Sequence, residues 1–566
     1  MSVIRQIEID NFRCINSFKW QPRSGVNCLI GSGDSGKSTV LEAVDLCLGA
    51  RRTVQFGDSD FHKLNIEKPI KIRVTVGGLD DTLKNLDSYG HALRGFNVST
   101  GELLSEPHKD AEPVITIQLV VASDLEPQWS LYSERLEEAD QSKSLPWGER
   151  LRLAPTRLGV AGDFHLSWRR GSILTRISDE EANIAAELSQ AIREARSTFG
   201  NKAKDKVLQA LGIVQKATSD LGIQAGQVTA LLDSQSLSFT GGSICLHSED
   251  GVPLRGLGLG STRLLISGLQ KQGANGSGMI LIDEVEHGLE PHRIIRLLTS
   301  LGAKDTDQKL QVFMTTHSPV VLRELSSSQL FVLRRMENDH EARWVSDDSD
   351  MQGTMRACAE AFLAPNVIIC EGSSEYGLLR GIDLYRVDQG EPSLTALGVA
   401  AADGKGSSMF ARTRAFVTLG YRTLLLKDND KQEIEEAIES EFQELGVPIL
   451  KCQSGRALED ELFQSLPDQA IQQILEFAVE LKGEELVDSN IKSADKALDL
   501  KICREQITPE VRAALAKASK SKNNAWFKSI TAMELIGWKI VGPCLKDCAE
   551  PLQYLIERIF AWSRNE

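Results

Sequence analysis

The sequence predicts an α/β protein built in two successive parts. A buried-type strand, a glycine-rich loop and a helical pattern follow one another at residues 26–44, and a second buried-type strand occupies 278–282. Near residue 366 the pattern restarts with short apolar strands that alternate with helices, which indicates a small parallel sheet. Because 566 residues exceed one ordinary domain, we expect a first domain at 1–345 and a second, with a helical C-terminal segment, at 346–566.

The composition is that of a globular protein with enough apolar residues for a core. Apolar residues make up 41% of the chain and charged residues 25%. The sequence contains no run of eighteen apolar residues, and its N-terminus alternates like a strand, so we expect a cytoplasmic protein that does not enter a membrane. The ten cysteines are scattered, which favours reduced thiols over a zinc site.

The net charge of −15 argues against a protein that coats nucleic acid nonspecifically. It is compatible with DNA binding, because phosphate contacts need only a local basic surface. One candidate surface combines Trp168-Arg169-Arg170 with Arg176. A second consists of the lysines that flank Trp526-Phe527, namely Lys517, Lys520, Lys522 and Lys528. Either group could equally be an ordinary solvated face.

The glycine-rich loop has the pattern G-x-x-x-x-G-K-[ST] in the strand–loop–helix setting that a phosphate-binding loop requires. Gly31 and Gly36 let the backbone curl so that its N–H groups point at phosphate oxygens. Lys37 would reach the β and γ phosphates of ATP, and Ser38 would ligate Mg²⁺. The residues expected to bind the nucleotide here are Gly31, Gly33, Gly36, Lys37, Ser38 and Thr39.

A second group of residues bears on the same nucleotide. The strand at 278–282 ends in Asp283, which would bind the metal through water, and Glu284, which would polarise the attacking water. Two acids that cap a strand are common, but here a segment at 286–291 and a strand ending in Thr315-Thr316-His317 follow. This order resembles the Walker B, D-loop and switch-histidine succession of ABC-type ATPases. The resemblance implies that His317 contacts the γ-phosphate.

The segment between these motifs bears on assembly. A glycine-rich stretch at 254–262 precedes a helix, where ABC-type ATPases place their signature. The resemblance implies that Ser261 and its helix N-terminus cap the γ-phosphate bound by a second subunit, and hence a homo-oligomer, at least a dimer. Because this copy is degenerate, ATP is either hydrolysed or only sensed. The helical pattern at about 175–225 fits an inserted dimerisation arm or ordinary core helices equally well.

Acidic residues follow the predicted strands of the second part. Glu371 follows the strand 366–370, with Glu375 four residues later, and Asp428 and Asp430 follow the strand 423–426. In parallel sheets the chemistry lies beyond the carboxyl ends of the strands. Oxygen ligands without histidine or thiolate suit Mg²⁺ or Mn²⁺. Two such ions, about 4 Å apart, would activate water and stabilise the leaving 3′ oxygen of a phosphodiester.

E-G-x-x-E followed by D-x-D resembles the TOPRIM domain of topoisomerases, primases and related nucleases. The resemblance implies that Glu371 is a general acid/base or a metal ligand, and that Glu375, Asp428 and Asp430 are metal ligands. Glu459 would complete the second metal site, and the neighbouring Asp460 and Glu461 compete for that role.

A P-loop ATPase followed by a TOPRIM domain resembles the OLD (overcoming lysogenization defect) family, which includes the Gabija-type nuclease subunit. Asp60-Phe61-His62-Lys63 and Ala525-Trp526-Phe527-Lys528-Ser529 are smaller matches. The second resembles the segment that carries an essential lysine, so Lys528 would neutralise charge on the pentacovalent phosphate, unless it is a surface cation with a packed stem. The resemblance implies an ATP-regulated, Mg²⁺- or Mn²⁺-dependent DNA endonuclease in antiphage defence, alone or beside a UvrD-like helicase or a retron reverse transcriptase.

Other functions use the same motifs. A topoisomerase would need a positioned nucleophilic tyrosine, and no family-like tyrosine segment is visible in the sequence. A primase would not need an ABC-type head. The sequence therefore favours neither of these two enzymes. The main alternative is a RecF-like, ATP-gated DNA-binding repair or loader protein whose TOPRIM domain is a non-catalytic scaffold. The presence of all four primary acids favours catalysis, because a scaffold would be expected to lose at least one charge.

Overall fold

The computed structural model describes residues 2–50, 53–159, 166, 172–174, 190–191, 193–194, 198, 246–249, 253–272, 278–306, 308–337, 339–430 and 432–565. The basic patch predicted at Trp168–Arg170 and Arg176 lies outside the described residues, as does nearly all of the helical segment predicted at 175–225.

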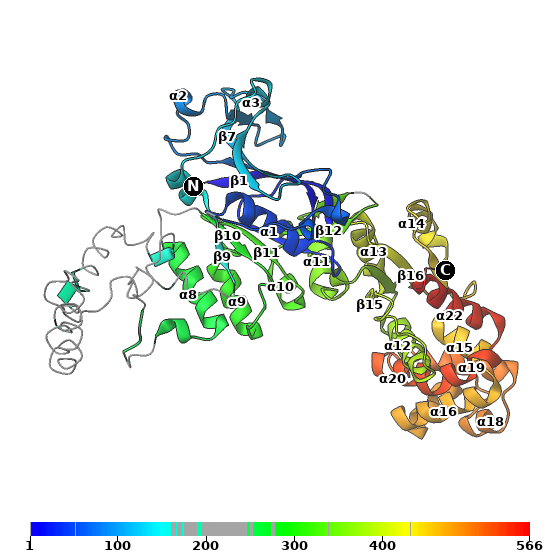
Figure 1. The fold of residues 1–566 in the computed structure, drawn as a ribbon. Coiled ribbons are helices and arrows are strands. Elements are labelled where there is room, and N and C mark those ends of the chain that lie inside the picture. The colour runs from blue at the N-terminus through cyan, green and yellow to red at the C-terminus, as the bar shows by residue number, and fades with distance from the viewer. Residues whose placement is uncertain are drawn as a thin grey trace, which may run out of the picture. The chain divides into compact units, whose positions relative to one another are not determined.

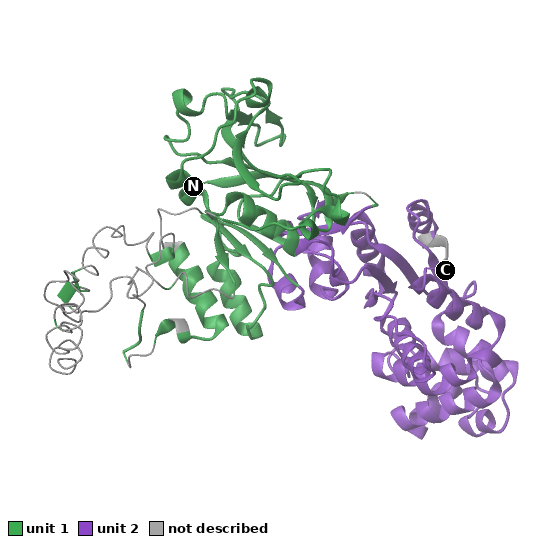
Figure 2. Ribbon diagram, viewed as in Figure 1, with its two compact units in different colours: residues 1–28, 38–316, 337–340 green, residues 29–37, 317–336, 341–566 purple. Residues whose placement is uncertain are grey.

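The chain divides into two compact units (Figure 2). Unit 1 contains residues 1–28, 38–316 and 337–340, and unit 2 contains residues 29–37, 317–336 and 341–566. Each unit is therefore made of stretches that do not follow one another directly along the chain. A boundary between two domains at residue 345 stays a prediction.

Unit 1 contains an antiparallel and a parallel group of strands. The antiparallel order is β6-β5-β7-β4-β1-β2, with β8 paired to β7, and the parallel order is β11-β10-β9, with β3 beside β11. The antiparallel strands are β1 (Val3–Phe12), β2 (Ile15–Trp20), β4 (Ile70–Gly77), β5 (Leu93–Phe96), β6 (Leu103–Leu104), β7 (Glu112–Val121) and β8 (Pro127–Tyr132). The others are β3 (Val26–Ile30), β9 (Thr156–Leu158), β10 (Met279–Ile282) and β11 (Gln311–Thr315).

The helices of unit 1 flank these strands. All residues of β3, β10 and β11 are buried, as expected for strands covered on both faces. Figure 1 shows α8 and α9, in green, side by side next to β9. The helices are α1 (Lys37–Leu48), α2 (Leu86–Tyr89), α3 (Glu134–Glu138), α4 (Trp147–Leu153), α8 (Leu259–Gln272) and α9 (Pro291–Ser300).

Unit 2 contains a four-stranded sheet in the order β15-β14-β16-β17, and every pair in it is parallel. The strands are β14 (Asn366–Cys370), β15 (Val399–Asp403), β16 (Arg422–Lys427) and β17 (Ile449–Lys451). Three of them coincide with predicted strands, whereas β15 was not predicted. Two further strands are β12 (Leu330–Arg335) and β13 (His340–Trp344). The nearby helices are α10 (Pro319–Glu324), α11 (Ser349–Ala357), α12 (Ser373–Asp388), α13 (Met409–Thr418), α14 (Gln432–Glu444) and α15 (Leu458–Ser465).

The C-terminal part of unit 2 is helical and shares one apolar core with the sheet. Its helices are α16 (Asp468–Lys482), α17 (Glu484–Ala494), α18 (Leu500–Glu505), α19 (Pro509–Ser519), α20 (Ile530–Ile536), the π-helical turn η8 (Gly537–Val541), α21 (Gly542–Cys544) and α22 (Glu550–Ser563). The predicted α/β class with a helical C-terminal region is confirmed. Within the described residues we find no helix with both the length and the apolar character needed to cross a bilayer.

Short 3₁₀ turns connect several of these elements. They are η1 (Asp58–Asp60), η2 (His62–Leu64), η4 (Leu254–Gly256), η5 (Ser327–Gln329), η6 (Ala361–Leu363), η7 (Gly406–Ser408) and η9 (Leu545–Asp547).

Glycines let α12 pack directly on α20 and η8. A Cβ on Gly381 would lie 2.1 Å from the carbonyl oxygen of Glu534 and 2.7 Å from the amide nitrogen of Trp538. A Cβ on Gly377 would lie 2.5 Å from the carbonyl oxygen of Ile530. Since backbone atoms cannot yield as a flexible side chain can, this contact fixes α12 against the segment that follows Lys528.

We expect Gly381→Ala to lower the free energy of unfolding of unit 2 by about 1–3 kcal/mol, because the added methyl group overpacks this contact. Gly353→Ala is a matched control: Gly353 lies on the exposed side of α11, and a Cβ there would meet nothing within 4 Å. There alanine should be neutral or stabilising by up to about 1 kcal/mol. Thermal unfolding followed by circular dichroism measures both, and equal unfolding temperatures for the two variants would contradict the close packing.

Candidate functional site

The phosphate-binding loop closes around the side chain of Lys37. This side chain is buried, and its Nζ donates to the carbonyl oxygens of Gly31 (3.1 Å) and Ser32 (2.8 Å) and to Ser35 Oγ (3.3 Å). The ammonium group is therefore satisfied by the loop itself. These are neutral acceptors, which the phosphate oxygens of a nucleotide would outcompete because charge-assisted hydrogen bonds are stronger.

Two of the three predicted glycines are required by the shape of this loop. Gly31 has a φ of +144°, and a Cβ there would lie 2.6 Å from the carbonyl oxygen of Leu333. Gly36 has a φ of +93°. At Gly33, in contrast, a Cβ would meet nothing within 4 Å. Its predicted role in nucleotide binding therefore rests on the motif and not on backbone strain.

Asp283 is the centre of a hydrogen-bonded group at the carboxyl ends of β10 and β11. Its Oδ1 accepts from Ser38 Oγ at 3.0 Å and from Thr315 Oγ1 at 2.6 Å. The Thr315 hydroxyl also accepts from the amide of Glu284 at 2.8 Å. The two residues predicted to serve the nucleotide-bound metal, Ser38 and Asp283, are thus in direct contact. Thr315 was not singled out from the sequence.

Glu284 stands in a strained conformation next to Asp283. Its φ is +48°, its carboxylate is exposed, and its Oε2 lies 3.8 Å from His287 Nδ1. Arg263, a buried residue of α8, holds the following turn by donating to the carbonyl oxygens of Glu284 (3.0 Å), Val285 (3.5 Å) and His287 (3.1 Å). Burial lowers the pKa of Arg263. Sequence reasoning missed this arginine.

The other predicted nucleotide contacts lie on neighbouring elements. Ser261 is in the first turn of α8, and its Oγ accepts from Arg293 at 3.2 Å. Thr39 lies on α1, with its Oγ1 3.4 Å from Cys14 Sγ. His317 is an exposed residue just after β11 and belongs to unit 2. The roles of these three residues toward the γ-phosphate or a second subunit stay predictions.

In unit 2, hydrogen bonds join three of the segments that carry predicted metal ligands. Glu371 follows β14, and its Oε2 accepts from the amide of Asp428, which follows the neighbouring strand β16, at 2.9 Å. Asp428 Oδ1 accepts in turn from the amide of Leu458, the first residue of α15, at 2.8 Å. The carboxyl edge of the sheet therefore gathers the acids as the strand order predicts.

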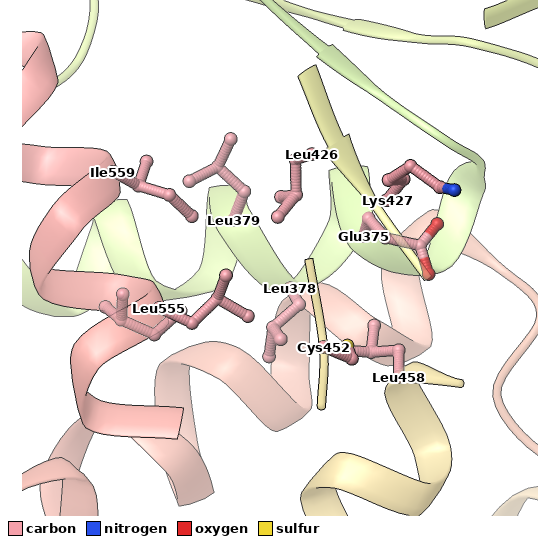
Figure 3. A pocket seen from close by; sticks show the side chains of 10 residues that line it. Glu375, Leu378, Leu379, Leu426, Lys427, Cys452, Leu458, Leu555 and Ile559 are labelled. Atoms are coloured by element: carbon pink, nitrogen blue, oxygen red, sulfur yellow. The ribbon is translucent and has the colours of Figure 1, made fainter. Parts of the chain in front are cut away.

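Glu375 lies in the first turn of α12, where its Oε2 accepts from the amide of Gly372 at 2.8 Å. Figure 3 shows its carboxylate at one end of an otherwise mainly apolar pocket. The rest of the lining is Leu378, Leu379, Leu426, Lys427, Cys452, Leu458, Leu555, Ile556 and Ile559. Burial against these side chains raises the pKa of Glu375, and the neighbouring carboxylates of Glu459 and Glu371 raise it further.

Asp428 shows that the five predicted carboxylates share one electrostatic environment. Burial raises its pKa well above the usual range, and four other carboxylates raise it further: Glu375, Glu371, Glu459 and Asp430. Burial and like charges both disfavour the ionised form. A bound divalent cation would relieve both effects, and an all-oxygen donor set fits Mg²⁺ or Mn²⁺.

The carboxylates do not form a finished coordination shell. Across the described residues, no group of three or more histidine, cysteine, aspartate or glutamate side chains is arranged to hold a metal ion. Asp430 in particular is exposed at the end of this cluster. The acids therefore share an edge of the sheet without converging on one point.

Contacts distinguish the three acids of α15. Asp460 Oδ2 accepts from the amide of Ala457 at 2.9 Å and pairs with Lys520, so it caps the helix. The carboxylate of Glu461 accepts hydrogen bonds from Gln453 N (3.0 Å), Arg456 Nη1 (3.2 Å) and Ser465 Oγ (2.7 Å), so it has a structural role.

Glu459 is the remaining acid of α15, and it is buried. Burial raises its pKa, whereas the positive charges of Lys528 and Lys520 act in the opposite direction. Glu459 therefore belongs to the same electrostatic environment as Asp428, and the positive charge of Lys528 acts on the carboxylate of Glu459. Lys528 itself is exposed, between the buried Phe527 and α20.

Asp403 is a further acid at this edge that the sequence analysis missed. It ends β15 and pairs in register with Cys370, the residue before Glu371. Its carboxylate accepts from Ser373 Oγ at 2.8 Å and pairs with Lys405 Nζ at 3.0 Å. A single aspartate after a short alanine-rich strand forms no motif, so only the register of the sheet places it here.

We expect Glu459→Gln and Glu461→Gln to change stability differently. Because burial raises the folded-state pKa of Glu459, its ionisation costs stability above the unfolded pKa of about 4.3. Glutamine at 459 should therefore leave the unfolding temperature unchanged or raise it at pH 8 in EDTA, and lose this advantage near pH 4. Glutamine at 461 should lower stability by about 1–3 kcal/mol, because the charge-assisted bond to Arg456 is lost. Differential scanning calorimetry at both pH values measures this, and equal losses would contradict the assignment.

Comparisons with known proteins cover up to 71% of the chain. A family model described as "AAA domain, putative AbiEii toxin, Type IV TA system" matches residues 26–323. The "OLD nuclease" of Thermus scotoductus (strain ATCC 700910 / SA-01) is 22% identical over 454 residues, which cover 71% of this chain and 78% of that protein. The "DNA replication and repair protein RecF" of Chlorobium phaeovibrioides (strain DSM 265 / 1930) is 33% identical over 111 residues, 18% of this chain and 30% of RecF.

Two solved structures are also similar to the chain. An SmcHead bound to the C-winged helix domain of ScpA has 15% identity and a TM-score of 0.35, covering 62% of this chain and 99% of that one. An Smc head domain with an extended coiled coil, bound to the C-terminal domain of ScpA derived from Pyrococcus furiosus, has 12% identity and a TM-score of 0.35, covering 60% and 96%. A likeness of this size carries no conclusion about the fold.

None of these findings bears on the Gabija-type detail, which stays a prediction. The family model spans just over half of the chain, from β3 to α10, and includes the phosphate-binding loop, Asp283 and His317. The similarity to the OLD nuclease over most of the chain supports the OLD-family relationship predicted from the order of the motifs. The chain therefore belongs to this AAA family and is related to the OLD nucleases.

Proposed function

We propose that this protein is an ATP-regulated, divalent-metal-dependent DNA endonuclease. The observation that carries the proposal is the set of five carboxylates at one carboxyl edge of a parallel sheet, where Glu371 Oε2 accepts from the amide of Asp428 and four other carboxylates act on the Asp428 side chain. Lys528 acts on one of the five, Glu459. Such a cluster costs stability without a ligand, because burial and mutual repulsion both oppose ionisation. The similarity to a protein named OLD nuclease supports a nuclease, and that to RecF supports an action on DNA.

We assign the following roles to residues of this chain. The carboxylates of Glu371, Glu375, Asp428, Asp430 and Glu459, in what we take to be a TOPRIM domain, would hold Mg²⁺ or Mn²⁺. When bound, two such ions supply an activated water and stabilise the leaving 3′ oxygen of the phosphodiester. Glu371 would also act as general acid or base, and Lys528 would neutralise charge on the pentacovalent phosphate.

The ATPase head, by which we mean the predicted first domain at 1–345, would bind ATP and regulate the nuclease. The loop from Gly31 to Thr39 would cradle the phosphates, with Lys37 exchanging its loop carbonyls for the β and γ phosphates. Ser38 and Asp283 would serve the nucleotide's Mg²⁺, and Glu284 would polarise water. His317, together with Ser261 of a second subunit, would contact the γ-phosphate, which requires at least a dimer.

A role in antiphage defence is inferred from the OLD-family relationship alone. We place the activity in the cytoplasm because the sequence has no long apolar run and its N-terminus alternates like a strand. The comparisons give no support for a UvrD-like helicase or a retron reverse transcriptase as partner.

The second candidate is a RecF-like, ATP-gated DNA-binding protein whose second part is a scaffold. The similarity to RecF over 111 residues favours it for the head. The mutually repelling acids, of which Glu375 and Glu459 are buried, disfavour it for the second part, because a scaffold would gain stability by losing one of them.

We expect Asp428→Ala to reduce plasmid nicking or linearisation in Mg²⁺ or Mn²⁺ by at least about 10–100-fold, because it removes the carboxylate on which four neighbouring carboxylates act. Glu441→Gln is the control: its carboxylate is exposed on α14 and pairs with Arg414. Gel analysis of supercoiled DNA with and without ATP measures both. If the wild type left DNA intact under every metal and nucleotide condition, the scaffold function would replace the nuclease.

We expect Lys37→Ala to weaken ATP binding by about 10–100-fold, the value of a charge-assisted hydrogen bond to phosphate. Lys19→Ala is the control and should bind ATP as the wild type does. Lys19 is an exposed lysine of unit 1, and its Nζ lies 3.6 Å from Glu8 Oε1. Equilibrium binding of a fluorescent ATP analogue compares the two variants. Equal affinities would show that the loop does not hold the nucleotide through Lys37.

A further inference from the structure

The segment from Lys520 to Lys528, here called the lysine loop, joins α19 to α20 and is anchored at its centre. Trp526 and Phe527 are each 2% exposed, and Phe527 stacks on Phe477 with ring centroids 6.4 Å apart. The amide of Trp526 donates to the carbonyl oxygen of Ser519 at 3.0 Å. These anchors fix where the lysines on either side emerge.

Two lysines of this loop lie beside the carboxylate cluster although the chain carries a net charge of −15. Lys520 and Lys528 both act on the carboxylate of Glu459. Lys522 and Lys528 are exposed, and the side chain of Lys520 is 33% exposed. Two cations, Lys520 and Lys528, thus lie beside the acids that a polyanion would approach, and Lys522 adds an exposed positive charge on the same loop. This arrangement favours binding of a phosphodiester backbone.

Lys520 differs from its neighbours because it already has an anionic partner. It pairs with Asp460, whose carboxylate also accepts from the amide of Ala457 at the start of α15. Asp460 would therefore keep a structural contact if Lys520 left. A partly exposed ion pair contributes little free energy, so a phosphate can take the place of the aspartate.

We propose that the lysine loop is a DNA-backbone clamp, in which Lys520 leaves Asp460 to bind a phosphate near the one that Lys528 neutralises. This inference rests on the proposed nuclease function and deepens it. Asp460 competes with DNA for Lys520 and thereby weakens binding in the resting protein.

The salt dependence of DNA binding tests the clamp. The full-length protein is titrated with a fluorescent duplex in EDTA, where no metal-dependent cleavage occurs, over a range of KCl concentrations. Lys520→Ala should lower affinity and reduce the slope of log K against log salt by about 0.9, the value of one phosphate contact on duplex DNA. Lys492→Ala is the matched control, because Lys492 also pairs with an aspartate, Asp488, at 2.6 Å. A wild-type slope in Lys520→Ala would overturn the clamp.

Removing the competing aspartate tests the exchange in the opposite direction. Asp460→Asn keeps an oxygen for the amide of Ala457 but frees Lys520, so affinity should rise about two- to fivefold, the range that exposed ion pairs contribute. Asp488→Asn, which likewise keeps an acceptor for the amide of Leu500, should show no rise. The rise should vanish in the double variant Lys520→Ala/Asp460→Asn. A rise that persists in the double variant, or none in Asp460→Asn, would overturn the exchange.

Failure of the clamp and failure of the nuclease are distinguishable. If the wild type neither binds nor cuts DNA, the proposed function fails and the clamp fails with it. If the wild type cuts DNA while Lys520→Ala keeps the wild-type salt slope, only the clamp is wrong.

Discussion

The repulsion among carboxylates at the carboxyl edge of the parallel sheet is the constraint on which the second unit depends. Adjacent strands place Glu371 against the backbone of Asp428, and the hydrogen bond between them prevents the acids from moving apart freely. Helix N-termini supply partial compensation, since the amides of Gly372 and Leu458 donate to Glu375 and Asp428. The glycine contact between α12 and α20 and the anchored lysine loop hold the remaining parts of the cluster in place.

The residues of the predicted nucleotide site are held in a different way, because Lys37 and Asp283 have hydrogen-bond partners within the protein. The carbonyl oxygens of the loop satisfy Lys37, and Asp283 is shared by Ser38 and Thr315. Arg263 ties the helix after the glycine-rich stretch to the turn that holds Glu284, so a movement of α8 would be felt at that glutamate. The nucleotide site would therefore exchange internal hydrogen bonds for contacts with ATP, whereas the carboxylate cluster is compensated only in part by the amides of Gly372 and Leu458.

Sequence motifs predicted the parts of both sites that lie close together along the chain. The loop from Gly31 to Ser38 and the acids that directly follow β14 and β16 are local patterns tied to strand ends. What the sequence could not supply depends on tertiary contacts. Asp403 is placed by the register of β15, and Arg263 by the turn against which α8 packs.

The acids of α15 illustrate the same limit at single residues. Glu459, Asp460 and Glu461 are consecutive and chemically alike, so no spacing argument separates them. The donors around Asp460 and Glu461 give those two structural contacts, and the burial of Glu459 near Lys528 leaves it for the cluster. The helical arm predicted at about 175–225 lies almost wholly outside the described residues, so it remains a sequence-based prediction.

The most direct test of a metal-binding carboxylate cluster is the unfolding temperature of wild type and Asp428→Asn, in EDTA and in Mn²⁺. In EDTA at neutral pH the asparagine variant should be the more stable, because it removes the cost of keeping an acid with a raised pKa protonated in the folded state, while the acceptor for the Leu458 amide remains. Mn²⁺ should stabilise the wild type through binding to the folded state and stabilise the variant much less, so that the order reverses. An equal Mn²⁺ effect on both proteins, or none on either, would contradict a metal site at this edge of the sheet.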